Sequence, residues 1–149
     1  TGAHRRFEWV GKAKDIRIFD DYAHHPTEIK ATLKAAQLLK ANRVIVIFQP
    51  HRFTRTQLLA DEFGDSFDLA DELYLLPIYS AGEKPIEGVS SDLIAEAVIH
   101  HNQLAPRQCA DFTEAIALLN QQLQPGDIVL TLGAGDVGKI GPMLLETLQ

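Results

Sequence analysis

The sequence predicts an α/β fold with a mostly parallel sheet and an antiparallel pairing of its first two strands. Short apolar segments typical of strands alternate along the chain with longer segments of helical periodicity. Residues 44–48 (VIVIF) are apolar without interruption, which is typical of a parallel strand covered on both faces. Helices between successive strands imply crossover connections. The expected result is a doubly wound, Rossmann-like sheet.

The first two strands are expected at residues 5–10 and 15–20, where apolar and polar side chains alternate. Gly11 and Lys12 lie in the expected turn between them, and so short a connection joins antiparallel strands. A helix is then expected to begin at Pro26, because proline suits the first helical position. Its buried face has the spacing of a helix and comprises Ile29, Leu33 and Ala36.

Strands and helices continue to alternate after the strand at 44–48. Further helices are expected near 54–67, 91–101, 112–123 and 137–148. Further strands are expected at 72–76, 107–110 and 127–132. Because no repeat or linker interrupts this pattern, we expect residues 1–149 to form a single domain.

Composition is that of an ordinary globular protein, with 46% hydrophobic and 23% charged residues. No apolar run approaches the roughly 20 residues that cross a bilayer, and the first residues lack the core of a secretory signal. The single cysteine, Cys109, cannot form an internal disulfide, which suits a reducing compartment. We therefore expect a cytoplasmic protein with no membrane partner.

Charge is distributed unevenly along the chain. The net charge of −6 argues against non-specific nucleic-acid binding, so no nucleic-acid partner is expected. Residues 1–55, however, hold eleven of the 14 basic and five of the 20 acidic residues, a local balance of +6. This basic first third could attract a phosphate or carboxylate, although charges scattered over solvated faces explain it as well.

Polar segments follow four of the expected strands. If the sheet is parallel, all four segments lie at one rim, where ligands of doubly wound sheets bind. We place the candidate site at that rim. The segments are residues 20–26, 49–55, 77–83 and 133–139.

The Gly-rich segment 133–138 matches two phosphate-binding patterns incompletely. It fits G-x-G-x-x-G, but that pattern normally opens the first βα unit and needs an acidic residue about 20 positions later. It also approaches a P-loop, yet Ile140 stands where a hydroxyl should bind magnesium. What remains is either a turn whose N–H groups face an anion or a tight strand-to-helix connection.

The segment after the buried strand carries His51, Arg52 and Arg55. A guanidinium offers paired donors that match a carboxylate or phosphate. Basic residues at a helix start are unfavourable for the macrodipole unless an anion compensates them. This favours a binding role over a merely solvated helix start.

The first segment offers Asp20, Asp21, Tyr22, His24 and His25 immediately before a helix. An aspartate at a strand end could accept hydrogen bonds from ribose hydroxyls. The two histidines point in different directions, and no cysteine lies near them in the sequence. We therefore expect no metal site here.

Two long motifs, residues 20–28 (DDYAHHPTE) and 48–56 (FQPHRFTRT), resemble those of the Mur ligases of peptidoglycan synthesis. Residues 1–8, 79–83 and 132–136 are similar to the same family in register, so the resemblance spans essentially the whole chain. The His-Arg-aromatic-Thr-Arg run of the second motif favours the alanine-adding members over the related ligase that attaches a recycled tripeptide.

This resemblance implies a three-domain, ATP-dependent ligase whose carboxy-terminal domain is residues 1–149. ATP would phosphorylate the carboxylate of UDP-N-acetylmuramate, and the amine of L-alanine would attack the acyl phosphate. The family carries its P-loop and Mg²⁺ ligands in the central domain. The UDP-sugar and ATPase domains, and with them the Mg²⁺ ligands, are therefore expected outside this chain, which alone would be inactive.

The resemblance also implies roles for single residues in amino-acid binding. Arg52 and Arg55 would hold the alanine carboxylate. His24 and His51, the expected catalytic residues, would orient alanine near the acyl phosphate together with Tyr22.

For ATP, the resemblance places Asp21 on the ribose and either Arg5 or Arg6 on the phosphates, without distinguishing the two. A different class of function is a free-standing nucleotide- or anion-binding module without catalysis. For such a module the Gly-rich segment and the basic first third would be sufficient. Micromolar ATP binding by the isolated chain would favour the module.

Overall fold

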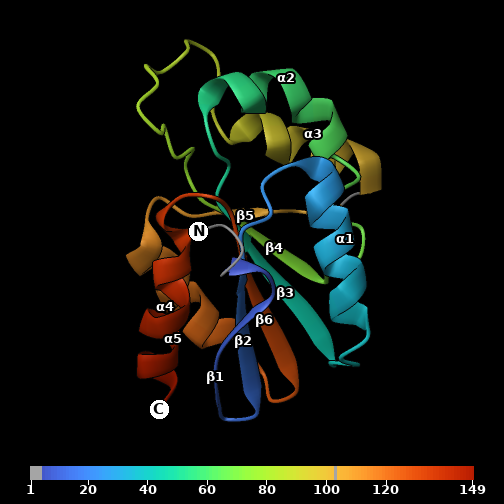
Figure 1. The fold of residues 1–149 in the computed structure, drawn as a ribbon, viewed down its shortest axis with the longest axis vertical. Coiled ribbons are helices and arrows are strands. Elements are labelled where there is room, and N and C mark those ends of the chain that lie inside the picture. The colour runs from blue at the N-terminus through green and yellow to red at the C-terminus, as the bar shows by residue number, and fades with distance from the viewer. Residues whose placement is uncertain (1–4, 103) are drawn as a thin grey trace.

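The computed structural model describes residues 5–102 and 104–149, which contain a six-stranded sheet with helices on both faces (Figure 1). The strands are β1 (Glu8–Ala13), β2 (Ile16–Asp21), β3 (Arg43–Phe48), β4 (Glu72–Leu75), β5 (Arg107–Gln108) and β6 (Asp127–Leu132). The helices are α1 (Pro26–Gln37), α2 (Phe53–Phe63), α3 (Asp92–Asn102), α4 (Phe112–Gln122), the 3₁₀ helix η2 (Asp136–Lys139) and α5 (Ile140–Leu148).

The strand order is β1-β2-β6-β3-β4-β5, and every neighbouring pair is parallel except β1 with β2. The predicted fold class is therefore confirmed. From β2 to β5 the chain moves across the sheet in one direction, and it then returns to insert β6 between β2 and β3. Right-handed crossovers place helices on opposite faces when the direction reverses.

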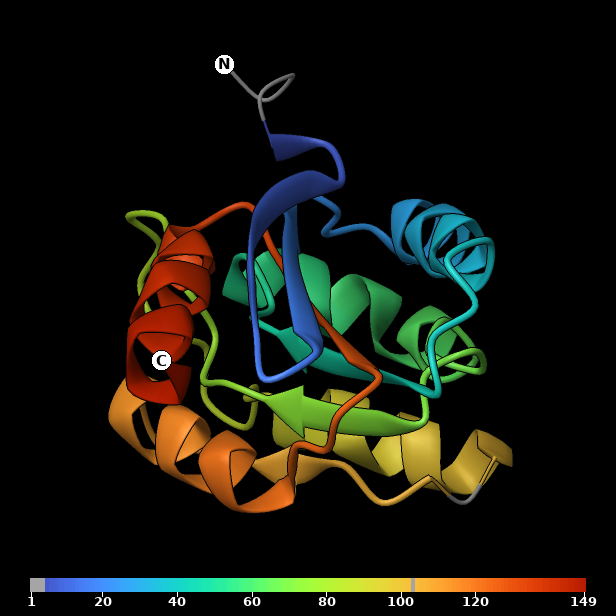
Figure 2. The same ribbon diagram turned by 90° about the horizontal axis from the view of Figure 1, so that it is seen from below.

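Two hydrophobic layers reflect this winding. Side chains from one face of the strands pack with α1, α2 and α3, as Phe48, Leu33 and Phe63 do. Alternate side chains on the other face, such as Ile47, pack with α4 and α5. Figure 2 shows α1 and α5 on opposite sides of the sheet. No helix in the described parts of the chain is long and apolar enough to cross a membrane.

The expected turn at Gly11 and Lys12 is wrong. Strand β1 continues through both residues, and the chain turns at Lys14 and Asp15, whose φ angles of 52° and 61° suit a two-residue hairpin. Gly11 instead lies beside a β-bulge, where a Cβ atom would approach Leu145 of α5 to 2.5 Å. The glycine thus serves helix packing.

Other boundaries shift by a few residues. Helix α2 ends at Phe63 and is followed by turns, and β5 has two residues where four were expected. The residue directly after α2 is Gly64, where a Cβ atom would lie only 2.8 Å from the Ala97 carbonyl oxygen of α3. A larger residue at this position would therefore push the two helices apart. The last helical segment begins as the 3₁₀ turn η2 before α5.

Candidate functional site

The polar segments meet at the carboxyl ends of the parallel strands, as predicted. Because β6 lies between β2 and β3, the Gly-rich segment that follows β6 lies between residues 20–26 and residues 49–55. The Gly133 N–H donates to the Asp21 carbonyl (3.2 Å), and the Gln49 N–H donates to the Leu132 carbonyl (3.0 Å). Gly133 has a φ of 149°, and a Cβ there would come within 2.9 Å of the Gln49 carbonyl oxygen.

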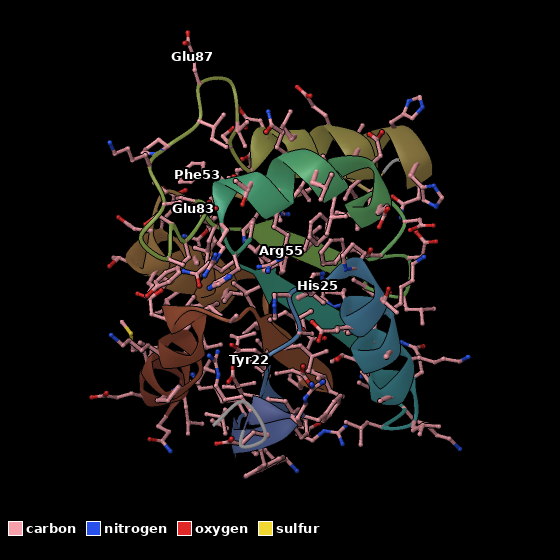
Figure 3. The ribbon with its side chains drawn as sticks, turned by 45° about the horizontal axis from the view of Figure 1, so that its top comes forward. Tyr22, His25, Phe53, Arg55, Glu83 and Glu87 are labelled. Atoms are coloured by element: carbon pink, nitrogen blue, oxygen red, sulfur yellow. The ribbon has the colours of Figure 1, made fainter. Side chains whose placement is uncertain are left out.

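A row of aromatic rings joins three of these segments. The centroids of His24 and His51 are 5.5 Å apart, and those of Tyr22 and His24 are 5.2 Å apart. Tyr79 stacks on His51 at 5.7 Å with an interplanar angle of 12°. Figure 3 shows Tyr22 and Arg55 on this rim. The expected meeting of the aspartate-tyrosine-histidine and two-arginine segments is confirmed, and the roles of their residues stay predictions.

The protonation of His51 follows from its neighbour. Arg55 Nη1 lies 3.0 Å from His51 Nδ1, and because a guanidinium can only donate, Nδ1 must be the unprotonated nitrogen. Burial, with further contributions from His24 and Arg55, lowers the pKa of His51 to about 4. At neutral pH the ring is therefore neutral, and its Nε2–H is a donor.

His24 is neutral with the opposite tautomer. Its Nδ1 lies 3.0 Å from the Tyr22 carbonyl oxygen, which can only accept, so Nδ1 carries the proton and Nε2 an open lone pair. Burial lowers the pKa of His24. Glu28 fixes the local backbone by accepting N–H hydrogen bonds from His24 and His25, both at 3.1 Å. His24 thus offers an acceptor at Nε2, and His51 offers a donor at Nε2.

Arg52 is the N-cap residue of α2 and has an unusual backbone conformation, with φ 76° and ψ 141°. Its side chain is exposed and has no hydrogen-bond partner among the described residues. The helix start is capped from another loop: Glu83 accepts from the N–H groups of Phe53 (2.6 Å) and Thr54 (3.2 Å) and from the Thr54 hydroxyl. The basic helix start therefore has an internal compensating anion, which removes the need for an external one. Sequence reasoning missed this role of Glu83.

Arg5 is committed to the Gly-rich turn. Its Nε donates to Asp20 (2.9 Å), and its two terminal nitrogens donate to the carbonyls of Gly135 and Gly133, each at 3.0 Å. The turn thus presents carbonyl groups to a cation, and Asp136 occupies the first position of η2, where it accepts from Gln49 (2.8 Å). Of the two readings left open for this segment, the tight connection fits and the anion cradle does not.

Asp21 and Arg6 border one hollow. Asp21 is only 3% exposed. Its carboxylate accepts hydrogen bonds from the N–H groups of Phe7 and Ala23, both at 2.8 Å. Each of its oxygens keeps one further lone pair. A hollow of about 380 Å³ lies between this strand end and α1, with Arg6 and Asp21 in its lining. Arg6 is exposed and, among the described residues, has no ion-pair partner.

The expectation of no metal site in residues 20–26 stays a prediction. In residues 5–102 and 104–149, no three His, Cys, Asp or Glu side chains are grouped so that they could hold a metal ion. Instead, His24 is hydrogen-bonded to the Tyr22 carbonyl and His51 to the Arg55 guanidinium.

Comparison with known proteins shows the family to which the chain belongs. A model of the "Mur ligase, glutamate ligase domain" family matches residues 5–135. The chain belongs to the Mur ligase family. This membership confirms the resemblance carried by the two long motifs.

Mur ligase relatives are similar over nearly the whole chain. The UDP-N-acetylmuramate–L-alanine ligase of Pelotomaculum thermopropionicum is 49% identical over 148 residues, which cover 99% of this chain and 32% of the relative. The crystal structure of the UDP-N-acetylmuramate–alanine ligase of Thermotoga maritima superposes with a TM-score of 0.77 at 25% identity, covering 97% of this chain and 30% of that one. This chain therefore spans about a third of the length of its curated relatives.

One solved Mur ligase relative has the same extent as this chain. It is a domain from a putative UDP-N-acetylmuramate:L-alanyl-γ-D-glutamyl-diaminopimelate ligase of Haemophilus ducreyi, with a TM-score of 0.68 and 26% identity. The match covers 97% of this chain and 100% of that one. A Mur ligase domain of this size thus folds and crystallises without the rest of its protein.

Proposed function

We propose that residues 1–149 are the amino-acid-binding, carboxy-terminal domain of a UDP-N-acetylmuramate–L-alanine ligase, with the UDP-sugar and ATPase domains in the remainder of the protein. One observation carries the proposal: two arginines and two neutral histidines, from separate segments, meet around the 5.5 Å contact of His24 and His51. The names of the relatives and the two long motifs support alanine as the substrate.

The complete enzyme would catalyse one step of peptidoglycan synthesis in the cytoplasm. ATP would phosphorylate the muramoyl carboxylate of UDP-N-acetylmuramate, giving an acyl phosphate and ADP. The alanine amine would then attack the acyl carbon, forming the amide and losing one proton while inorganic phosphate leaves. This domain would contribute by holding the amine in line with the acyl group.

Arg52 and Arg55 are the proposed carboxylate binders. The guanidinium of Arg52 is exposed at the rim, whereas Arg55 is half-buried and fixed by His51, to whose carbonyl oxygen it also donates (3.2 Å). Two guanidinium groups three residues apart at a helix start can both reach one carboxylate. Tyr22, beside His24, would close the amino-acid pocket.

His24 and His51 would have different roles in amide formation, one as an acceptor and the other as a donor. The open Nε2 lone pair of His24 would accept a proton or hydrogen bond from the attacking amine. The Nε2–H of His51 would donate to a phosphate or carbonyl oxygen as negative charge develops there. Because both rings are neutral at pH 7, neither repels the incoming ammonium group.

ATP would reach the hollow beside α1. Asp21 would accept a hydrogen bond from the ribose, and Arg6, rather than Arg5, would reach the phosphates, since the donors of Arg5 are occupied by Asp20 and the Gly-rich turn. Mg²⁺ would neutralise phosphate charge. We place its ligands in the central domain, as the resemblance to the family implies.

The test uses the full-length enzyme with ATP, UDP-N-acetylmuramate and L-alanine. Removing a carboxylate-binding guanidinium with Arg52→Ala should raise the KM for alanine about a hundredfold, while the KM for UDP-N-acetylmuramate changes little. Arg17→Ala, at the opposite end of β2, is the matched control. An unchanged KM for alanine in Arg52→Ala would show that the carboxylate binds elsewhere.

A further inference from the structure

The start of α2 lacks a cap of its own. Its N-cap residue is Arg52, which has no side-chain acceptor, and its first turn contains no acidic residue. The first N–H groups of a helix have no partner within the helix and need an acceptor. For Phe53 and Thr54 that acceptor is the carboxylate of Glu83, which lies in the loop between β4 and α3.

This loop is held against the segment that it caps. The Tyr79 N–H donates to the Pro50 carbonyl, and the Arg52 N–H donates to the Tyr79 carbonyl, both at 2.8 Å. The loop then turns back towards α2, and the Glu83 N–H closes this turn by donating to the Ser80 carbonyl (3.0 Å). Figure 3 shows Glu83 close to Phe53, whereas Glu87 lies at the outer end of the same loop.

The residue between these attachments is Arg52. Its φ of 76° is unfavourable for a side chain with a Cβ atom and persists only where neighbours enforce it. The enforcing contacts are the Tyr79 carbonyl on the N–H of Arg52 and Glu83 on the next N–H along the chain. The hydrogen bond from the Thr54 hydroxyl lowers the pKa of Glu83, which keeps the carboxylate ionised.

We propose that Glu83 is a positioning residue, which caps α2 from the loop between β4 and α3 and thereby aims the Arg52 guanidinium at the substrate carboxylate. The role of Arg52 in this statement rests on the proposed function. The negative charge of Glu83 also balances the arginines when no substrate is bound. Without Glu83, Arg52 relaxes to a common backbone conformation and its guanidinium leaves the site.

The capping part is tested on the isolated chain, because a relative's domain of this extent folds alone. Amide hydrogen exchange at Phe53 and Thr54 should accelerate about tenfold in Glu83→Ala. It should accelerate less in Glu83→Gln, which keeps one acceptor oxygen. Glu87→Ala, in the same loop but exposed, is the matched control. Unchanged exchange in the Glu83 variants would overturn the proposal.

The positioning part is tested in the full-length enzyme. Glu83→Ala should raise the KM for alanine about tenfold with a smaller change in kcat, with Glu83→Gln intermediate and Glu87→Ala unchanged. If Glu83 acts through Arg52, this increase disappears in the Arg52→Ala background. Should Glu83→Ala not fold, Glu83→Gln decides.

The outcomes separate the two hypotheses. An effect of Arg52→Ala on the KM for alanine, without one of Glu83→Gln, would overturn the positioning role and leave the proposed function standing. No effect of Arg52→Ala would instead overturn the carboxylate-binding role proposed for Arg52, on which the positioning role rests.

Discussion

The Arg55 guanidinium donates to His51 Nδ1 at 3.0 Å, which ties a basic side chain to a histidine that must remain unprotonated. The pair is unusual, because a protonated imidazole could not accept this hydrogen bond and would also repel the guanidinium. The contact therefore makes the rim sensitive to acid.

His51 should titrate far below an ordinary histidine. We expect an NMR titration of the isolated chain to give a pKa of about 4, because burial and the nearby positive charges disfavour the imidazolium. In Arg55→Gln the pKa should rise, although burial keeps it below 6.5. A pKa near 6.5 in the unmodified chain would contradict the hydrogen bond.

Stability should follow the same titration. Between pH 6.5 and pH 4 the unfolded chain binds a proton at His51 that the folded chain does not, so the free energy of unfolding falls as the pH drops through this window. The contribution of His51 should be about 1 kcal/mol, allowing for its partial exposure. Urea unfolding at several pH values should show a shallower decline for His51→Gln. Equal declines would refute this.

Arg43 should matter for stability and not for binding. At the end of the sheet opposite the site, it makes two hydrogen bonds to Asp127 (3.0 and 2.7 Å) and one to Glu72 (2.6 Å). The side chain of Asp127 is 1% exposed, so Arg43→Ala leaves a buried carboxylate without its cation. We expect a loss of about 3 kcal/mol in urea unfolding, against about 1 kcal/mol for Arg17→Ala, which removes one hydrogen bond to a carbonyl.

The two adjacent arginines should separate in their effects. Arg5→Lys cannot bridge Asp20 and two carbonyls at once and should lower the free energy of unfolding by about 2 kcal/mol. Arg6→Ala should leave it within about 0.5 kcal/mol and instead raise the KM for ATP in the full-length enzyme. The reverse pattern would mean that Arg5 leaves the Gly-rich turn to bind phosphate.

Gly135 should be intolerant of a side chain. A Cβ there would lie 2.6 Å from Tyr79 Cγ and 2.7 Å from Gln49 Oε1. We expect Gly135→Ala to displace Tyr79 from His51, to remove the ring-current shift of the His51 protons, and to cost about 1–2 kcal/mol of stability. Gly88→Ala is the control: it strains the backbone without a clash, so it should leave the His51 signals in place.

Local patterns were sufficient to predict the fold and the meeting of the candidate segments at one rim. The uninterrupted apolar segment at β3 and the alternation with helices predicted the parallel sheet, and parallel strands bring their carboxyl ends to one rim. The segments that carry His24 and His51 could therefore be expected to meet at one rim from the sequence alone.

Long-range contacts could not be predicted. Gly11 resembles a turn residue in the sequence, but its reason is Leu145 of α5. Glu83 caps a helix that begins 30 residues earlier, and Arg5 clamps a turn some 128–130 positions later. Such partners depend on how the strands are ordered, which periodicity along the chain does not encode.

The position of β6 means that the sheet cannot be completed until this strand has been synthesised. Of the six strands in this sheet, β6 is the last to be synthesised, yet it separates β2 from β3 in the finished sheet. Without residues 127–132, the β1–β2 and β3–β4–β5 groups would lack the strand that joins them, and any edge that they formed would be open to pairing with another chain. Translation stopped before this strand would therefore yield an aggregation-prone product rather than a smaller working domain.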